Sequence, residues 1–363
     1  MVGLPEKIKQ IEEEMSKTQI NKHTEHHIGM LKAKLARIRA ELESSTSKSG
    51  GPTFEIKKGG DATVVLIGLP SVGKSTILNR LTNAKSKVAS YAFTTLTVVP
   101  GILRYNGADI QILDLPGIIS GASSGKGRGK RVLSVARNAD LVLLVLDVFQ
   151  PGQIQVLKHE LHGMGIRINE KPPDVTINRA TKGGLALTTS TKLTKLSQAT
   201  VKGIVEAYGV SNGSILIRED ITDDQLIDVL TGNRRYVPSL VVLNKVDLVN
   251  PKYLTAVTNQ VGSDFVPISA EKGLNMELLT ERIWETLNFI RIYLKRPDGE
   301  PDFEKPLILP SGSTLRDVCK KIHPRFSERA KYALVSGPSV KYSGQRVGLD
   351  HRPVDKDVVT IMR

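Results

Sequence analysis

The sequence has a single cysteine and no long apolar run, and both absences restrict the kind of protein that it can encode. The lone Cys319 excludes an internal disulfide and fits a reducing compartment. No run of roughly 18 apolar residues occurs, so we expect no membrane-spanning helix. The segment from Met1 to Met15 is charged and lacks the apolar core of a signal peptide. We therefore expect a soluble, cytoplasmic protein with no membrane partner.

Acidic residues are in deficit. The 363 residues include 51 Lys and Arg against 37 Asp and Glu, which gives a formal net charge of +14. This excess favours an anionic partner. The chain is long enough for roughly two to four domains.

A complete phosphate-loop pattern, G-x-x-x-x-G-K-[ST], follows the apolar run Ala62–Ile67. That run is typical of a buried strand, and Ser75–Leu81 has helical spacing. Strand, glycine-rich turn and helix together predict a phosphate-binding loop whose N–H groups hold a β-phosphate. The candidate nucleotide-binding residues here are Gly68, Leu69, Pro70, Ser71, Val72, Gly73, Lys74, Ser75 and Thr76. Lys74 would reach the β- and γ-phosphates, and the Ser75 hydroxyl would bind Mg²⁺.

A second expected strand, Ile110–Leu113, leads into a D-x-x-G motif. Asp114 would hold a Mg²⁺-bound water, and the Gly117 N–H would contact the γ-phosphate. The candidate residues of this motif are Asp114, Leu115, Pro116, Gly117 and Ile118. Between the two motifs, Thr95, or failing it Thr94, would complete the Mg²⁺ shell only when the γ-phosphate is present. The candidate catalytic residues are Lys74, Thr95 and Gly117.

An N-K-x-D motif follows the apolar run Ser239–Leu243, and its residues are Asn244, Lys245, Val246 and Asp247. Asp247 would accept hydrogen bonds from N1–H and N2–H₂ of guanine, a pair that adenine cannot donate. Lys245 would lie over the ribose and base, and the backbone N–H groups of Ser269 and Ala270 would approach guanine O6. In this order the motifs predict a GTPase and disfavour an ATPase.

Several longer stretches identify a family. GLPSVGKST, YAFTTLTVVPG, ILDLPGIISGASSGKGRGKRV, LNKVDLV and SVKYSGQRVGLDH resemble the developmentally regulated GTP-binding (DRG) proteins of the Obg superfamily. The resemblance covers essentially the whole chain and is closest to a compact, archaeal member. It implies GTP hydrolysis to GDP and phosphate, association with translating ribosomes and a cytoplasmic location. Eukaryotic relatives also bind a dedicated regulatory protein.

Two positions depart from better-known GTPases. Ile118 stands where Ras-like enzymes have the glutamine that orients the attacking water. Slow intrinsic hydrolysis is therefore expected, unless a backbone group, Thr94 or Thr95, a monovalent cation or a partner positions the water. Ser71 stands where related K⁺-using enzymes often have an asparagine, and its oxygen could still bind K⁺. Ile118 and the family resemblance, rather than Ser71, motivate the hypothesis that K⁺ stimulates turnover.

The fold class expected is α/β: a P-loop GTPase domain with a mostly parallel sheet, carrying three appended parts. Nearly a hundred residues separate the expected strand Leu141–Asp147 from Asn244, which requires an insert. The expected divisions are a helical hairpin and linker at 1–60, the GTPase domain at 61–164 and 237–294, an α+β insert at 165–236, and a TGS-like β-grasp domain at 295–363. The GTPase domain is expected to end with a helix through Leu294.

Basic clusters favour RNA as the anionic partner, although each could also be a solvated surface. The cluster on the second N-terminal helix comprises Lys32, Lys34, Arg37 and Arg39. The cluster that follows the D-x-x-G motif comprises Lys126, Arg128, Lys130, Arg131 and Arg137. The cluster in the TGS-like domain comprises Lys331, Lys341, Arg346 and Arg352. The TGS-like domain lacks the family's usual tryptophan near Ser336, so no base-stacking platform is expected there. The leading hypothesis is a monomeric, ribosome- or rRNA-associated switch in translation, and the alternative is a signalling switch whose effector is a protein.

Overall fold

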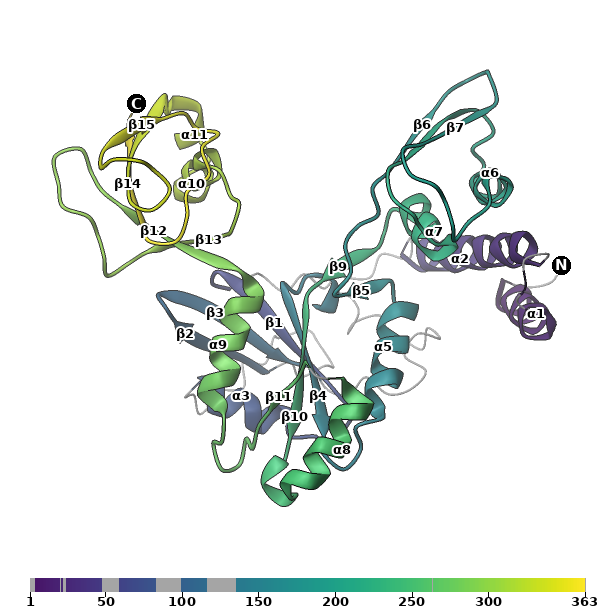
Figure 1. Cartoon of the computed structure of the whole chain (residues 1–363), viewed down its shortest axis with the longest axis horizontal. Coiled ribbons are helices and arrows are strands. Elements are labelled where there is room, and N and C mark those ends of the chain that lie inside the picture. Colours follow the sequence, from purple (N-terminus) through teal and green to yellow (C-terminus); the bar gives the residue numbers. More distant parts are fainter. Residues whose placement is uncertain are drawn as a thin grey trace. The chain divides into compact units, whose positions relative to one another are not determined.

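The computed structural model describes residues 4–19, 21, 24–47, 59–82, 99–115, 135–262 and 264–362 (Figure 1). The chain divides into two compact units, one made of residues 1–53 with 170–236 and the other of residues 54–169 with 237–363. No helix within the described ranges is long and apolar enough to cross a bilayer.

The first unit combines the N-terminal helices with the insert. Its helices are α1 (Leu4–Lys17), α2 (Glu25–Ser47), α6 (Gln198–Ala207) and α7 (Asp223–Thr231), and its strands are β6 (Val175–Arg179), β7 (Leu185–Thr189) and β8 (Gly213–Ile217). The central strand β8 is antiparallel to β6 and parallel to β7. Ala33 of α2 is buried in the same core as Ile204 of α6 and Ile215 of β8. The N-terminal hairpin and the insert therefore share a hydrophobic core.

Helix α2 also makes polar contacts with the insert. The Lys32 ammonium lies 2.9 Å from Asp223 and 3.1 Å from Asp224, and the Arg37 guanidinium donates to the Ala207 carbonyl at 3.0 Å. Arg39 pairs with Glu12 of α1 at 2.7 Å. Three of the four basic residues on this helix thus contact acidic or carbonyl groups that are distant in sequence, although the side chains of Arg37 and Arg39 stay about half exposed.

The second unit contains the GTPase-like sheet, in the strand order β11-β10-β4-β1-β3-β2. All neighbours are parallel except β2 and β3. The strands are β1 (Ala62–Ile67), β2 (Val99–Tyr105), β3 (Ala108–Asp114), β4 (Leu141–Asp147), β10 (Ser239–Asn244) and β11 (Val266–Pro267). β1 and β10 are buried along their whole length, as expected of parallel strands covered on both faces.

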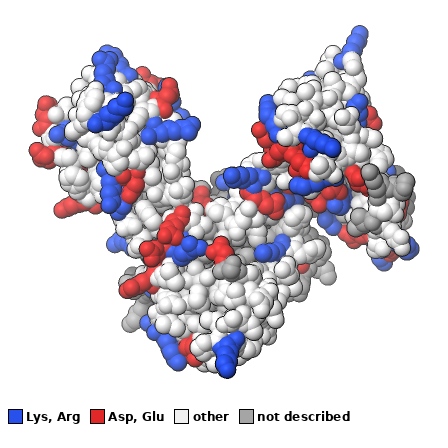
Figure 2. All heavy atoms as spheres, in the orientation of Figure 1, with Lys and Arg blue, Asp and Glu red and all other residues white. Residues whose placement is uncertain are grey.

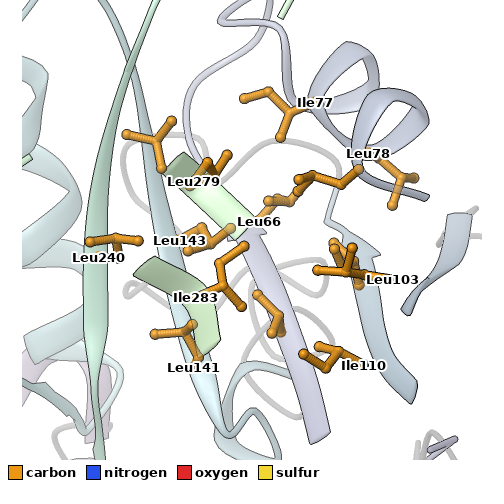
Figure 3. Close-up of a cluster of buried hydrophobic side chains, with 14 of the residues drawn as sticks. Leu66, Ile77, Leu78, Leu103, Ile110, Leu141, Leu143, Leu240, Leu279 and Ile283 are labelled. Carbon is orange, nitrogen blue, oxygen red and sulfur yellow. The ribbon is translucent and has the colours of Figure 1, made fainter. Parts of the chain in front are cut away.

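Helices cover both faces of this sheet (Figure 1). They are α3 (Lys74–Thr82), α5 (Gln153–Gly163), α8 (Pro251–Val261) and α9 (Met276–Leu287); a short strand β5 (Ile166–Ile168), a 3-10 turn (Val246–Leu248) and strand β9 (Arg235–Val237) complete the connections. On one face, Ile77 and Leu78 of α3 and Ile283 of α9 pack against Leu66 and Leu143 (Figure 3). This packing fixes the carboxyl ends of β1, β4 and β10 relative to α3.

The C-terminal part of the second unit is a five-stranded sheet with two short helices. Its elements are β12 (Phe289–Leu294), β13 (Leu307–Pro310), α10 (Leu315–Ile322), α11 (Phe326–Arg329), β14 (Tyr332–Ser336), β15 (Gln345–Val347) and β16 (Asp357–Met362). The strand order is β13-β12-β16-β14-β15. Only β12 and β16 are parallel neighbours.

The predicted helix through Leu294 is wrong at its end. Helix α9 ends at Leu287, Asn288 adopts a left-handed conformation with φ 50°, and strand β12 follows. Ile290 and Ile292 are buried while Arg291 between them is half-buried. This period-two alternation is typical of a strand, and the helically spaced apolar residues that precede it, Leu279, Ile283 and Leu287, concealed it.

Candidate functional site

The turn between β1 and α3 depends on two glycines. A Cβ on Gly68 would overlap the Val145 carbonyl oxygen of β4, and a Cβ on Gly73 would overlap the Asn244 side-chain amide. Gly73 also has φ +94°, a left-handed conformation that favours glycine. The loop can therefore take this path only with glycine at both positions, and it lies directly against β4 and β10.

Lys74 folds back over the loop that precedes it. Its ammonium donates to the Gly68 carbonyl at 3.1 Å and to the Leu69 carbonyl at 2.9 Å. Burial lowers the pKa of Lys74, and the charge of Asp114 only partly offsets this. The loop thus holds a buried cation that neutral carbonyls alone do not fully compensate, so an anionic group in the loop would stabilise it.

A hydroxyl and a carboxylate meet beside that cation. The Ser75 hydroxyl donates to Asp114 Oδ2 at 2.5 Å, from the start of α3 to the end of β3. Asp114 Oδ1 is buried and has no hydrogen-bond partner among the described residues. Oxygen ligands of this kind, one of them unused, fit a divalent cation such as Mg²⁺. The other residues predicted for this part of the site, Thr94, Thr95, Pro116, Gly117 and Ile118, lie outside the described residues.

Asn244 at the end of β10 links two loops of the site. Its side-chain nitrogen donates to the Val72 carbonyl at 2.9 Å, and its side-chain oxygen accepts from the Ala270 N–H at 3.0 Å. The side chain is only 3% exposed. One amide therefore joins the phosphate loop to the Ser269–Ala270 segment, which brings together three motifs that are far apart in sequence.

Lys245 lies across the same junction. It has a left-handed backbone with φ 68°, and its ammonium donates to the Ser71 carbonyl at 3.0 Å and pairs with Asp147 at 2.6 Å. Asp147 stands at the end of β4 and is in register with Asn244 on β10. Sequence reasoning missed Asp147, although a charged residue that ends a buried strand beside the β10 motif was a usable signal.

Two groups hold the Asp247 carboxylate. The Ser269 hydroxyl, and after it the Lys272 ammonium at 3.2 Å, lower the pKa of Asp247. The lowered pKa keeps the Asp247 carboxylate ionised at neutral pH. Its side chain is 11% exposed, so the carboxylate can still be reached from solvent. Lys272 also donates its backbone N–H to the Ser269 hydroxyl at 3.2 Å. Lys272 was not predicted, because an exposed lysine in a loop gives no distinctive pattern.

The Ser269–Ala270 segment is tied down from several sides. The Ser269 N–H donates to the Leu274 carbonyl at 3.2 Å, while the Ala270 N–H donates to Asn244. Arg80 of α3 donates to the Ala270 carbonyl at 3.0 Å and also to the Glu271 carbonyl. Arg80 is a third residue that sequence reasoning missed, since nothing in the helix pattern distinguishes it from a solvated arginine.

Comparison with known proteins agrees with this arrangement. Residues 63–179 match the family described as "50S ribosome-binding GTPase", residues 182–289 match the C-terminal region of that domain, and residues 290–363 match the TGS domain. An uncharacterized GTP-binding protein of Methanocaldococcus jannaschii is 51% identical over 365 residues, covering 100% of this chain and 93% of that protein.

Named relatives align along their full length. The developmentally-regulated GTP-binding protein 1 of Xenopus laevis is 46% identical and its protein 2 counterpart of Bos taurus 45%, each covering 100% of both chains. The expected fold class is confirmed by the parallel sheet and the matching GTPase and TGS families. The chain belongs to the family of developmentally regulated GTP-binding proteins and is a P-loop GTPase.

Proposed function

We propose that GTP binds at the carboxyl ends of β1, β4 and β10, with its phosphates in the loop 68–75 and its base at Asp247. The observation that carries this proposal is the Asn244 amide, which bonds both to Val72 in the phosphate loop and to Ala270. Lys74 would leave its loop carbonyls for the β- and γ-phosphates, and successive loop N–H groups would hold the β-phosphate. The Lys245 side chain would lie over the ribose and base.

The base would be read by a carboxylate that is already oriented. Asp247, ionised and held by Ser269 and Lys272, would accept from N1–H and N2–H₂ of guanine. Adenine lacks this pair of donors, so it would gain no such hydrogen bonds from the carboxylate and would bind more weakly. Because the Ser269 and Ala270 N–H groups already have protein acceptors, guanine O6 would share the Ala270 N–H or accept from the following residue.

Mg²⁺ would be held by the Ser75 hydroxyl and, through water, by Asp114, with Thr95 completing its shell and the Gly117 N–H on the γ-phosphate. When bound, the ion neutralises charge that develops between the β- and γ-phosphates. Asp114 Oδ1, buried and unused, supports this assignment. K⁺ stimulation is proposed from Ile118 and the family resemblance, with the Ser71 oxygen as a candidate ligand; equal turnover in K⁺ and Na⁺ buffers would contradict it.

The GTP cycle would act on the ribosome in the cytoplasm. GTP would order the Thr95 and Gly117 segments, the ordered state would bind ribosomal RNA through the appended domains, and hydrolysis would release it. The net charge of +14 and the family description "50S ribosome-binding GTPase" support this reading. A protein effector is the second candidate, favoured by the ion pairs of Lys32 and Arg39 in α2, which partly offset the positive charge of this helix.

Co-sedimentation with ribosomes at physiological K⁺ tests the proposal, with a non-hydrolysable GTP analogue compared with GDP. An Asp247→Asn variant provides a matched control. Its amide can accept from N1–H and donate to the 2-oxo group of xanthine, so it should prefer xanthine to guanine. We expect more wild-type protein to pellet with the GTP analogue, and Asp247→Asn to respond only to the xanthosine analogue. Pelleting that is absent or equal in both nucleotide states would refute a GTP-gated ribosome factor.

A further inference from the structure

The β14–β15 hairpin concentrates positive charge. Residues 329–349 contain Arg329, Lys331, Lys341 and Arg346 but no Asp or Glu. Within the described part of the chain, none of these four side chains forms an ion pair. Over the face drawn in Figure 2 as a whole, blue and red residues are interspersed. A segment with a single sign of charge and no internal counter-ions is suited to a polyanion.

The two faces of this hairpin differ in their packing. Ala333 and Val335 of β14 are buried in a core with Leu315 and Val318 of α10. Because side chains alternate along a strand, Tyr332 and Leu334 lie on the opposite face. Arg346 of β15 is directly opposite Leu334 in the strand register, so it lies on that outer face as well.

On this outer face an arginine covers an aromatic ring. The Arg346 guanidinium carbon lies 4.0 Å from the centre of the Tyr332 ring, while Arg346 itself is exposed. A guanidinium that stacks on one side with a ring has a second planar side, here toward solvent. Unpaired bases stack on arginine planes and on aromatic rings alike. Because the sequence lacks the family's tryptophan near Ser336, no stacking platform was expected in this domain. Arg346 and Tyr332, on neighbouring strands, together offer one.

We propose that the Arg346–Tyr332 stack receives an unpaired base of single-stranded RNA, while Lys331 and Lys341 contact the adjacent phosphates. Tyr342, which is 65% exposed in the same hairpin, offers a second ring to the strand. This inference deepens the proposed ribosomal RNA association and rests on it. RNA is favoured over a protein partner for two reasons. All the charges of the hairpin have one sign, and its aromatic rings, Tyr332 and Tyr342, lie next to the basic residues Arg346 and Lys341.

The test uses the full-length protein with a non-hydrolysable GTP analogue and a short single-stranded RNA that carries one 2-aminopurine. Stacking quenches this base, so its fluorescence reports contact with the platform as well as binding. Arg346→Lys keeps the charge but removes the plane, and we expect roughly tenfold weaker binding and loss of quenching. Arg325→Lys, an exposed arginine in the same domain, is the matched control and should leave both unchanged.

Salt dependence separates stacking from charge. Arg346→Lys should leave the slope of log Kd against log salt unchanged, whereas Lys331→Ala should reduce it by about one phosphate contact. Tyr332→Leu should also abolish quenching, and its circular dichroism should match the wild type. If Arg346→Lys binds and quenches the RNA as Arg325→Lys does, the platform is refuted and the hairpin is instead a charged protein-contact surface.

The two proposals fail differently. If the wild-type chain does not bind ribosomes but Arg346→Lys still weakens RNA binding and quenching, the ribosomal proposal fails and the platform stands. If ribosomes bind wild type and Arg346→Lys equally and the RNA probe shows no difference, only the platform fails.

Discussion

Gly73 and Asn244 are so close that the side-chain amide of Asn244 occupies the space that a Cβ on Gly73 would take. The glycine of the phosphate loop is therefore required by the guanine motif as well as by its own left-handed backbone. The same amide bonds to Val72 and Ala270 with both of its polar atoms. A single side chain thus links the phosphate loop to the N-K-x-D motif and to the Ser269–Ala270 segment.

Asn244→Ala should lose both stability and nucleotide affinity. It leaves the buried Val72 carbonyl and Ala270 N–H unpaired, which costs about 1–3 kcal/mol for each group. Denaturant unfolding and titration with a fluorescent GDP measure the two effects. Asn250→Ala is the control, because its side chain caps α8 by accepting from the Tyr253 N–H at 2.8 Å. That loss should cost about 1 kcal/mol of stability and leave GDP affinity unchanged; an equal loss of affinity in both variants would contradict the linking role of Asn244.

Lys74→Met should stabilise the nucleotide-free protein while abolishing tight GDP binding. Burial lowers the pKa of Lys74 from the ordinary lysine value of 10.5, so at neutral pH the folded state bears the full cost of a buried ammonium. In the window between the lowered folded pKa and 10.5, the unfolded chain binds more protons, so wild-type stability should rise with pH. Subtracting the unfolding free energy of Lys74→Met at each pH isolates this rise. A difference that is flat with pH would show that the lysine is not destabilised by burial.

Lys272→Met should raise GDP affinity. The Lys272 ammonium lies on one Asp247 oxygen, and guanine donors need that carboxylate. An ion pair whose lysine is 66% exposed is worth no more than about 1 kcal/mol, so affinity should rise by a few-fold at most. Lys252→Met, an exposed lysine on α8, should have no effect. Weaker GDP binding in Lys272→Met would indicate that the lysine contacts the nucleotide rather than competing with it.

The parts of the site that sequence could predict are those defined by local patterns. The apolar runs 62–67, 141–147 and 239–243 are strands, and their motifs lie at the adjacent strand ends, because a parallel sheet brings its carboxyl ends to one edge. Glycine spacing fixed the phosphate loop for the same local reason. Each of these patterns can be recognised from residues that are close together in the sequence.

The parts that sequence could not predict depend on contacts between distant residues. Lys32 looks like a solvated cation until α7 brings Asp223 and Asp224 to it. Arg346 and Tyr332 form a stack only because β14 and β15 pair in one register. Helix α9 ends at Leu287 because residues 289–294 pair with β13 and β16, strands that come later in the chain.

Arg80→Lys should selectively weaken base recognition. The Arg80 fork donates to two carbonyls, of Ala270 and Glu271, and so fixes from α3 the segment that we propose to contact guanine O6. A lysine keeps the charge but cannot reproduce the fork, and hydrogen bonds from a charged group contribute about 1.5–3 kcal/mol. GDP affinity should fall roughly tenfold, and the preference for GDP over IDP, whose base lacks the 2-amino group, should narrow because Asp247 and Ser269 lose a fixed neighbour. Arg282→Lys on α9, whose ion pair with Asp264 is at the surface, should change neither quantity. If both variants bind GDP and IDP like the wild type, the α3 tether has no part in reading the base.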